Sequence, residues 1–270
     1  MEKLFTYKNV TICYSIWGSG SKSILTFHGF GQTKASFRPF EKVFEEYTFY
    51  NFDLFFHGKS LWNEQAPYLT KEFWGALISA FLTEHHIRSF SLVGYSMGGK
   101  FVLAILEKFP DQIERIILIA PDGIKTSFWY SLATYPYWIR VLFKKTIHDP
   151  LLFKRFVRLI RAFRLVDKSL LKFAETQMDT EEKRARVYFS WVVFRALKFD
   201  MDIISSFLNR HQIILEVFLG KYDKMITEKN LQDLLNKVTN FKMNILETGH
   251  NKLIAEVAEY YKNNENGPKR

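Results

Sequence analysis

The stretch Gly94-Tyr95-Ser96-Met97-Gly98 lies between an apolar run, Phe90 to Val93, and a helix-like segment, Lys100 to Leu106. A sharp turn from strand to helix strains the backbone of the residue at its tip, and it brings the positions two residues away too close to their surroundings for a Cβ atom. Glycine on both sides of Ser96 meets this steric demand. The stretch therefore predicts that a strand ends at the serine, and that its hydroxyl lies beside helix N–H groups that favour negative charge.

Two more polar residues follow apolar runs later in the chain. Asp223 comes after Val217 to Gly220, and His250 comes after a third run and Gly249. Serine is a poor nucleophile at neutral pH and needs a base to take its proton, and an imidazole does this best when a carboxylate fixes its tautomer. The chain order Ser, Asp, His therefore predicts that Ser96 is a nucleophile, that His250 is its base and that Asp223 orients the base.

With this order, and with His28-Gly29-Phe30-Gly31 after an early strand, the chain resembles the α/β-hydrolase superfamily over nearly its whole length. The resemblance implies an α/β-hydrolase fold: a mostly parallel eight-stranded sheet with helices on both faces and a helical cap insertion. It also implies that the backbone N–H groups of Phe30 and Met97 form an oxyanion hole. Asp122 occupies an acid position used in some relatives, but the spacing Gly-x-x-Asp at Asp223 fits the commoner pattern.

The order of the predicted elements supports the same architecture. Strand-like runs alternate with helical periods in the first and last parts of the chain, which indicates βαβ units on a parallel sheet. The early elements are strands at Ser23 to Phe27, Thr48 to Asp53, Phe90 to Val93 and Ile113 to Ile119, and helices at Ala35 to Glu46 and Lys71 to His86. We therefore assign residues 1–120 and 206–270 to a core domain, and residues 121–205, where the strands stop, to the cap.

Most of the net charge of +10 falls in the cap. Residues 121–205 carry 16 basic and 9 acidic side chains, against 12 and 11 in residues 1–120 and 10 and 8 in residues 206–270. Leu152 to Leu165 has the pattern of a basic amphipathic helix, which fits a lid helix with a solvated outer face as well as a helix at a membrane surface. The aromatic runs at 128–130 and 135–138 fit an acyl pocket and a lipid interface equally well.

Other residues are given roles by the resemblance. His28 corresponds to the histidine before the oxyanion glycine, which braces that loop by hydrogen bonds. Residues 53–60 resemble the superfamily segment Asp-x-x-Gly-His-Gly-x-Ser, but Phe56 stands before His57 where glycine is customary. The expected substrate contacts come from four aromatic residues: Phe30, Tyr95, Trp129 and Tyr130.

Composition excludes several classes of protein. The basic charge is local and comes without zinc-finger spacing or an RNA-binding aromatic motif, so we expect no nucleic-acid partner. The single cysteine, Cys13, cannot form an internal disulfide or a metal-binding cysteine cluster. No segment resembles a signal peptide or a membrane span, so the expected location is the cytoplasm.

Together these residues predict a serine hydrolase that cleaves a small or medium carboxylic ester, or a related thioester or amide, through an acyl-enzyme on Ser96. No cofactor or metal is expected. Two alternatives use the same fold: a slow ligand receptor or signalling protein, and a lipase that binds membranes through the basic cap. The sequence predicts neither the natural substrate nor the oligomeric state, because the fold does not fix the reaction.

Overall fold

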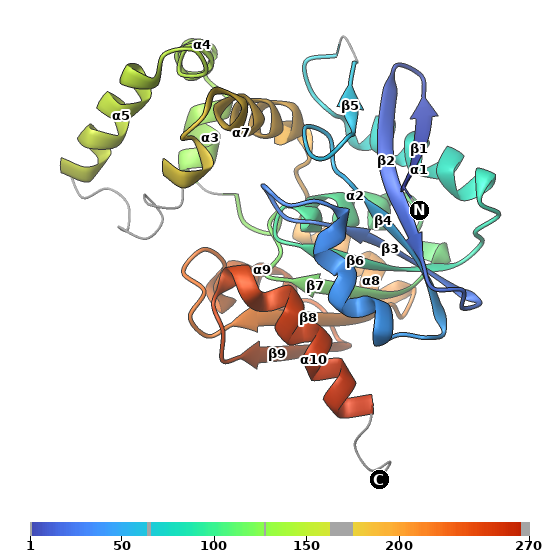
Figure 1. Cartoon of the computed structure of the whole chain (residues 1–270). Coiled ribbons are helices and arrows are strands. Elements are labelled where there is room, and N and C mark those ends of the chain that lie inside the picture. The colour runs from blue at the N-terminus through green and yellow to red at the C-terminus, as the bar shows by residue number, and fades with distance from the viewer. Residues whose placement is uncertain (1, 64–65, 127, 163–174, 266–270) are drawn as a thin grey trace. The chain divides into compact units, whose positions relative to one another are not determined.

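The computed structural model describes residues 2–63, 66–126, 128–162 and 175–265 of the chain (Figure 1). The chain forms two compact units. Unit 1 comprises residues 1–64, 70–125 and 197–270, and unit 2 comprises residues 65–69 and 126–196. The second unit therefore ends before helix α8 (Met201–Arg210), which packs on α2 (Gly98–Lys108) and α9 (Glu228–Leu235) of unit 1. The predicted boundaries at 120/121 and 205/206 differ from these by several residues.

Unit 1 contains one sheet with the order β1-β2-β4-β3-β6-β7-β8-β9, and the short strand β5 pairs with β2. The pairs from β4 through β9 are parallel, whereas β2 is antiparallel to β1, β4 and β5. The strands are β1 (Glu2–Tyr7), β2 (Val10–Trp17), β3 (Lys22–Phe27), β4 (Tyr47–Phe52), β5 (Leu61–Trp62), β6 (Phe90–Tyr95), β7 (Ile113–Ile119), β8 (Ile214–Gly220) and β9 (Phe241–Leu246). The predicted α/β-hydrolase fold with a mostly parallel sheet is confirmed. The described sheet has nine strands where eight were predicted, because the two-residue β5 pairs with β2.

Helices cover both faces of this sheet, as parallel strands require. On one face, α1 (Lys71–Glu84) packs on α2, α2 on α8, and α8 on α9; on the other, α10 (Leu253–Glu265) packs on η1 (Lys34–Lys42) (Figure 1). Two short 3₁₀ helices, η2 (Pro110–Gln112) and η4 (His250–Lys252), lead into β7 and α10. The strands buried between the layers read as nearly continuous apolar runs, such as Ile113–Ile119.

The segment predicted as a helix at 35–46 is a 3₁₀ helix instead. Phe37 and Phe40 are its buried residues, and Pro39 lies inside it. A 3₁₀ helix has three residues per turn, so side chains at i and i+3 lie on one face. The spacing of three that suggested an α-helix fits this tighter helix equally well, and proline has no N–H for an α-helical bond.

Aromatic side chains pack the centre of unit 1. The ring of Phe27 stacks on Phe52 with centroids 5.3 Å apart and meets the edge of Trp74 at 5.7 Å. The indole N–H of Trp74 donates to the carbonyl of Phe101 over 3.2 Å, so this buried polar atom is satisfied. The contact ties α1 to α2 beneath the turn that carries Ser96.

All the secondary-structure elements described in unit 2 are helices. Its elements are α3 (Phe128–Thr134), α4 (Tyr137–Lys145), α5 (Pro150–Ala162), α7 (Glu181–Val193) and η3 (Phe194–Ala196). A small apolar cluster of Ile147, Tyr188 and Val192 joins the end of α4 to α7, with Phe143 packed against it. No helix among the described residues of either unit is long and apolar enough to cross a bilayer.

The glycines around Ser96 are required by close backbone contacts. A Cβ atom on Gly98 would lie 1.9 Å from the carbonyl oxygen of Phe27, and one on Gly94 would lie 2.8 Å from Cγ2 of Val102. The first turn of α2 therefore lies directly against the end of β3. These contacts explain the sequence pattern, because no other residue type leaves room for the neighbouring strand and helix.

We predict that Gly98→Ala lowers the free energy of unfolding by about 1–3 kcal/mol, because the alanine methyl group would overlap the Phe27 carbonyl. Helix propensity alone predicts a gain of about 1 kcal/mol at this position in α2, so the sign of the change distinguishes the two effects. Urea denaturation measures it. Gly249→Ala is the matched control, because Gly249 has a φ of −97° and a methyl group added there would meet no atom within 4 Å. This variant should unfold like the parent.

Candidate active site

Ser96 lies at the junction of β6 and α2 with a φ of 49°, in the left-handed region that is rare for non-glycine residues. Three backbone hydrogen bonds hold it there. Its N–H donates to the carbonyl of Ile119 over 2.9 Å, and its carbonyl accepts from the N–H groups of Gly99 and Asp122, each over 2.9 Å. The surrounding structure thus imposes a strained conformation of the kind that clusters at functional sites.

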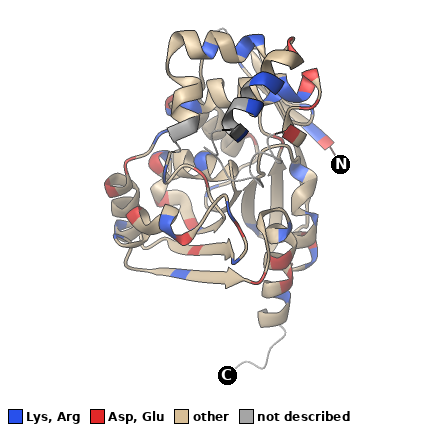
Figure 2. Cartoon of the chain, turned by 90° about the vertical axis from the view of Figure 1, so that its left-hand side faces the viewer, with Lys and Arg blue, Asp and Glu red and all other residues tan. Residues whose placement is uncertain are grey.

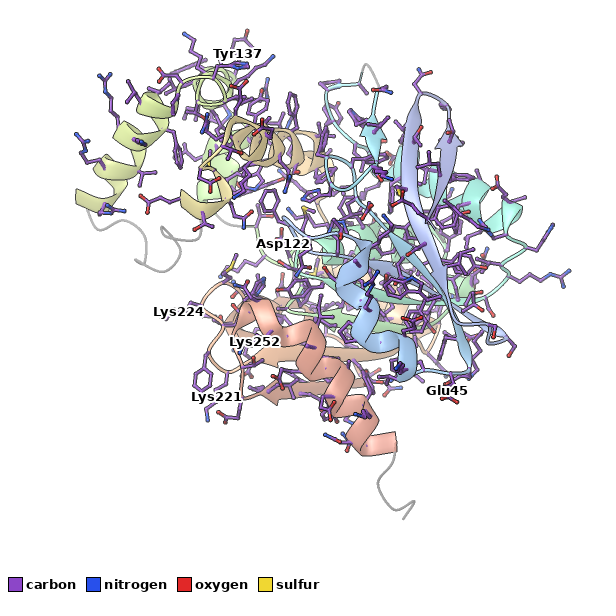
Figure 3. The ribbon with its side chains drawn as sticks, viewed as in Figure 1. Glu45, Asp122, Tyr137, Lys221, Lys224 and Lys252 are labelled. Atoms are coloured by element: carbon purple, nitrogen blue, oxygen red, sulfur yellow. The ribbon has the colours of Figure 1, made fainter. Side chains whose placement is uncertain are left out.

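His250 and Asp223 lie beside this serine. In the chain, His250 is 154 residues from Ser96 and 27 residues from Asp223. Nε2 of His250 is 3.1 Å from Oγ of Ser96, and Nδ1 of His250 is 2.6 Å from Oδ2 of Asp223. Lys224 and Lys252, labelled in Figure 3, mark the loops after β8 and β9 that carry the acid and the histidine. The structure therefore brings the three predicted residues together in the predicted order.

The carboxylate of Asp223 is fully satisfied although its side chain has no solvent exposure. Oδ1 accepts hydrogen bonds from the N–H groups of Met225 (2.7 Å) and Ile226 (3.1 Å), which leaves Oδ2 for His250. An ionised carboxylate accepts only, so Nδ1 of the imidazole carries the proton and Nε2 is free to accept from the Ser96 hydroxyl. This tautomer is the one in which the histidine can act as a base toward Ser96.

The alternative acid, Asp122, has a different partner. Its Oδ2 lies 3.0 Å from Nζ of Lys100, and its Oδ1 accepts from the N–H of Gly123 over 2.7 Å. The Lys100 side chain is only 7 % exposed, so the carboxylate balances a buried charge in α2. Of the two candidate acids, Asp223 is the one that contacts the histidine.

The loop after β3 lies close to the serine. A Cβ atom on Gly29 would lie 3.2 Å from Cβ of Ser96 and 2.7 Å from the ring of Tyr95, so only glycine fits. The N–H of Gly29 is held by the side chain of Gln32, whose Oε1 accepts from it over 3.2 Å. Phe30, next in this loop, is half-buried, and Met97 directly precedes α2, where backbone N–H groups have no partner within the helix.

Two neutral histidines brace this loop. His28 donates from Nδ1 to the carbonyl of Gly29 (2.7 Å) and accepts at Nε2 from the N–H of Leu54 (3.0 Å). His57 donates from Nδ1 to the carbonyl of Phe55 and accepts at Nε2 from the N–H of Gly31, each over 3.0 Å. Because one nitrogen of each ring accepts from an N–H group, each ring is uncharged in this arrangement.

Phe56 adopts the conformation that the glycine customary at this position would adopt. Its φ is 67°, in the left-handed region. The departure from the superfamily pattern therefore leaves the turn before His57 intact, at a cost of about 1–3 kcal/mol in backbone strain.

Tyr95 supports the histidine loop and has little exposed surface. Its hydroxyl donates to the carbonyl of His250 over 2.8 Å, and its ring lies 5.1 Å from the imidazole. Burial, together with the negative charge of Asp223, holds the pKa of Tyr95 above its ordinary value, so the hydroxyl remains a donor. Only 3 % of the residue is exposed. The Tyr95 hydroxyl is therefore engaged with the backbone of His250, and its contact with substrate stays a prediction.

The two predicted substrate contacts in the insertion lie in α3. Tyr130 donates from its hydroxyl to the carbonyl of Trp191 over 2.9 Å, and its ring packs on the indole of that residue at 5.3 Å. The side chain of Trp129 lies outside the described residues. Tyr130 therefore joins α3 to α7 within unit 2.

A separate hollow of about 500 Å³ contains none of the predicted site residues. It is lined by Ser79, Leu82, Thr83, His86, Ile87, Arg88, Phe109 and Gln112. Among the described residues, no three His, Cys, Asp or Glu side chains gather into a group that could hold a metal ion. The predicted site residues of unit 1 lie instead at the turn after β6 and in the loops after β3, β8 and β9.

Comparison with known proteins agrees with this architecture. A family model described as alpha/beta hydrolase fold matches residues 22–256. The chain therefore belongs to the alpha/beta hydrolase family. A thermophilic esterase from Thermogutta terrifontis has the same fold, with a TM-score of 0.67 and 14% identity, and the match covers 98% of this chain and 97% of that one.

Curated relatives match over shorter stretches. The protein named "Putative esterase/lipase 2" of Mycoplasma pneumoniae is 30% identical over 103 residues, or 37% of this chain and 38% of the relative. The "sn-1-specific diacylglycerol lipase ABHD11" of Danio rerio is 28% identical over 123 residues, or 44% of this chain and 38% of the relative. These matches span less than half of the relatives' length. Together with the family match, they support a hydrolase.

Two features of the site were missed by the sequence analysis. The contact of Tyr95 with the His250 carbonyl joins residues 155 positions apart, and the pair of Lys100 with Asp122 depends on the packing of α2 against the turn after β7. The signal available in the sequence was a lysine two residues after Gly98, where the glycines predict close packing, because a lysine buried there needs a partner.

We predict that Asp223→Asn slows the reaction of Ser96 with a fluorophosphonate by roughly 10³–10⁴-fold, because the amide no longer stabilises the charged imidazole or fixes its tautomer. Asp122→Asn is the matched control. It should react within about tenfold of the parent and lower the melting temperature, because it leaves Lys100 without its counter-charge. Adduct formation followed by mass spectrometry gives the rates. The reverse ranking of the two variants would assign the acid to Asp122.

A second prediction separates positioning from substrate contact at Tyr95. In Tyr95→Phe the ring remains and the hydrogen bond to the His250 carbonyl is lost, which costs about 1 kcal/mol. Since 1.4 kcal/mol corresponds to tenfold, we expect kcat for an ester substrate to fall by about fivefold with KM unchanged. Steady-state kinetics measures both constants. A raised KM with an unchanged kcat would instead indicate that the hydroxyl binds substrate.

Proposed function

We propose that this protein is a serine hydrolase that cleaves a small or medium carboxylic ester, with thioesters and amides as related substrates, through an acyl-enzyme on Ser96. The observation that carries the proposal is the continuous hydrogen-bonded path from Ser96 Oγ through His250 to the buried carboxylate of Asp223, with distances of 3.1 and 2.6 Å. These are the contacts that a nucleophile, its base and an orienting acid require.

The first half of the reaction forms the acyl-enzyme. Ser96 Oγ attacks the ester carbonyl carbon while Nε2 of His250 takes its proton, and the resulting imidazolium is stabilised by Asp223. The tetrahedral intermediate then collapses. The bond from carbon to the leaving oxygen breaks, and the imidazolium returns its proton to the departing alcohol.

The second half releases the acid. Water gives a proton to Nε2 of His250 and attacks the acyl carbon, and the second intermediate collapses with the proton passing back to Ser96. The net reaction consumes one water and yields a carboxylic acid and an alcohol. No oxidant, reductant or cofactor takes part in these steps.

The N–H groups of Phe30 and Met97 are proposed to hold the oxygen of both intermediates. Support comes from the close approach of Gly29 to Ser96 and from the position of Met97 at the start of α2. A donor of this kind contributes about 3–4 kcal/mol to the transition state. The bracing by His28 and His57 then has a function, because it fixes the loop that supplies the first of these donors.

The relatives named as esterases and lipases support an ester as the substrate class. Contact of the acyl chain with Phe30, and with Trp129 and Tyr130 of unit 2 acting as a cap, is part of the proposal, as is a cytoplasmic location. A series of p-nitrophenyl esters of increasing acyl length tests the size of the substrate.

Ser96→Ala provides the direct test. We expect it to lower kcat for a short p-nitrophenyl ester by at least about 10⁴-fold and to abolish fluorophosphonate labelling, because the nucleophile is gone. Ser206→Ala is the matched control: Ser206 is an exposed serine of α8 that donates only to the Ile203 carbonyl, and its loss should leave turnover unchanged.

Two results would contradict the proposal. Folded parent protein that neither reacts with the probe at Ser96 nor turns over any ester of the series would exclude a serine hydrolase. Acylation that stops at one equivalent would favour the alternative of a ligand receptor that retains the three residues.

A further inference from the structure

Helix α4 of unit 2 has an outer face made of apolar and aromatic side chains. The exposed fractions are 67 % for Tyr137, 81 % for Trp138, 38 % for Val141 and 48 % for Leu142. At 100° per residue these four positions fall within an arc of about 140°. Figure 3 shows Tyr137 at the outer edge of this helix.

The opposite side of α4 anchors the helix to unit 2. Phe143 packs against the cluster of Ile147, Tyr188 and Val192, and its ring meets that of Tyr188 at 5.3 Å. Since this contact fixes the rotation of α4, the exposure of Trp138 follows from the packing of unit 2. Large apolar side chains gathered on a surface in this way are typical of a binding site.

Basic side chains accompany these apolar groups on α4 and on the next helix, α5. Helices α4 and α5 together contain seven Lys and Arg and no Asp or Glu: Arg140, Lys144, Lys145, Lys154, Arg155, Arg158 and Arg161. Figure 2 draws the Lys and Arg of the chain in blue, and blue segments recur along the helices at the top of that view. In α5 the buried residues Phe153 and Val157 lie four apart, whereas Leu151 is 63 % exposed.

Most of this positive charge has no ion-pair partner among the described residues. Arg161 pairs with Glu175 over 2.8 Å, but the other six residues take part in no ion pair between described residues. Two other acidic residues near the start of α7 pair outside α4 and α5: Asp179 with Lys183, and Glu181 with His148. The surface therefore presents a strong positive potential beside exposed apolar groups.

From these features we infer that α4 and α5 form a docking surface for an anionic lipid bilayer. Tyr and Trp are suited to the boundary between headgroups and acyl chains, and exposed Val141, Leu142 and Leu151 would enter the apolar layer. Lys and Arg stems extend along such a boundary while their charged ends reach lipid phosphates. Duplex nucleic acid would match the charge but would leave the three aliphatic side chains in water. The inference goes beyond the proposed hydrolase activity and does not depend on it.

Sedimentation with vesicles tests this docking surface in the full-length protein. We expect binding to mixed phosphatidylcholine–phosphatidylglycerol vesicles at low salt, weaker binding at an ionic strength of ~0.15 M, and none to phosphatidylcholine alone. Trp138→Ala/Leu142→Ala and Lys144→Glu/Lys145→Glu should each weaken binding by at least about tenfold, since both the apolar and the charged contacts contribute.

Matched controls come from unit 1. Ile203→Ala removes an aliphatic side chain of similar exposure, 47 %, and Lys3→Glu/Lys229→Glu reverses two exposed charges, so both variants should bind vesicles like the parent. Circular dichroism and the thermal melting temperature verify that every variant is folded. Addition of anionic vesicles should also shift the tryptophan emission of the parent to the blue, and Trp138→Phe should remove most of that shift.

Three outcomes overturn the inference. The first is the absence of binding to anionic vesicles at low salt. The second is parent-like binding by Trp138→Ala/Leu142→Ala, which would reduce the effect to charge alone. The third is binding to duplex DNA that exceeds binding to vesicles and that only the charge-reversed variant loses, which would assign the surface to nucleic acid.

Discussion

The close contact between the first turn of α2 and the end of β3 is the constraint on which the site depends. With a glycine at position 98 the helix begins directly against the Phe27 carbonyl, and the chain can turn from β6 into α2 only with Ser96 in the left-handed region, at a φ of 49°. Such a conformation costs about 1–3 kcal/mol for a non-glycine residue. The cost is offset by the hydrogen bonds from Gly99 and Asp122 to the Ser96 carbonyl and by the aromatic core beneath.

The parallel sheet explains how distant residues converge on this turn. Strands β3, β6, β7, β8 and β9 run side by side in one direction, so the loops that follow them meet at the same edge. That edge collects Gly29, Ser96, Asp122, Asp223 and His250. Of the two carboxylates, one is directed to the histidine and the other to a buried lysine, and each is satisfied by its own partners. The polar groups are therefore fixed in place before any substrate binds.

Unit 2 has a small apolar core of its own. A small apolar cluster and the buried Arg184, which donates to the Ile147 carbonyl over 2.9 Å, hold α4 against α7. The described side chains on the other faces of α4 and α5 include aromatic, aliphatic and basic groups that are exposed to solvent. The basic amphipathic pattern at 152–165 was apparent in the sequence, although Arg164 and Leu165 at its end lie outside the described residues. The exposure of Trp138 was not apparent, because the run 135–138 fits a buried pocket as well as an interface.

The sequence by itself determined the α/β class, because its alternation of apolar runs and helical periods fits βαβ units on a parallel sheet. The motifs around Ser96 and His28 carried the resemblance that implied the α/β-hydrolase fold. The sequence also pointed to Ser96, Asp223 and His250, since each follows an apolar run at a predictable place. Tertiary structure alone decided which carboxylate reaches the histidine, that Tyr95 packs under His250, that Phe56 adopts a glycine-like backbone, and that α8 belongs to unit 1. These outcomes depend on contacts between segments far apart in the chain, and local patterns of polarity carry no information about such contacts.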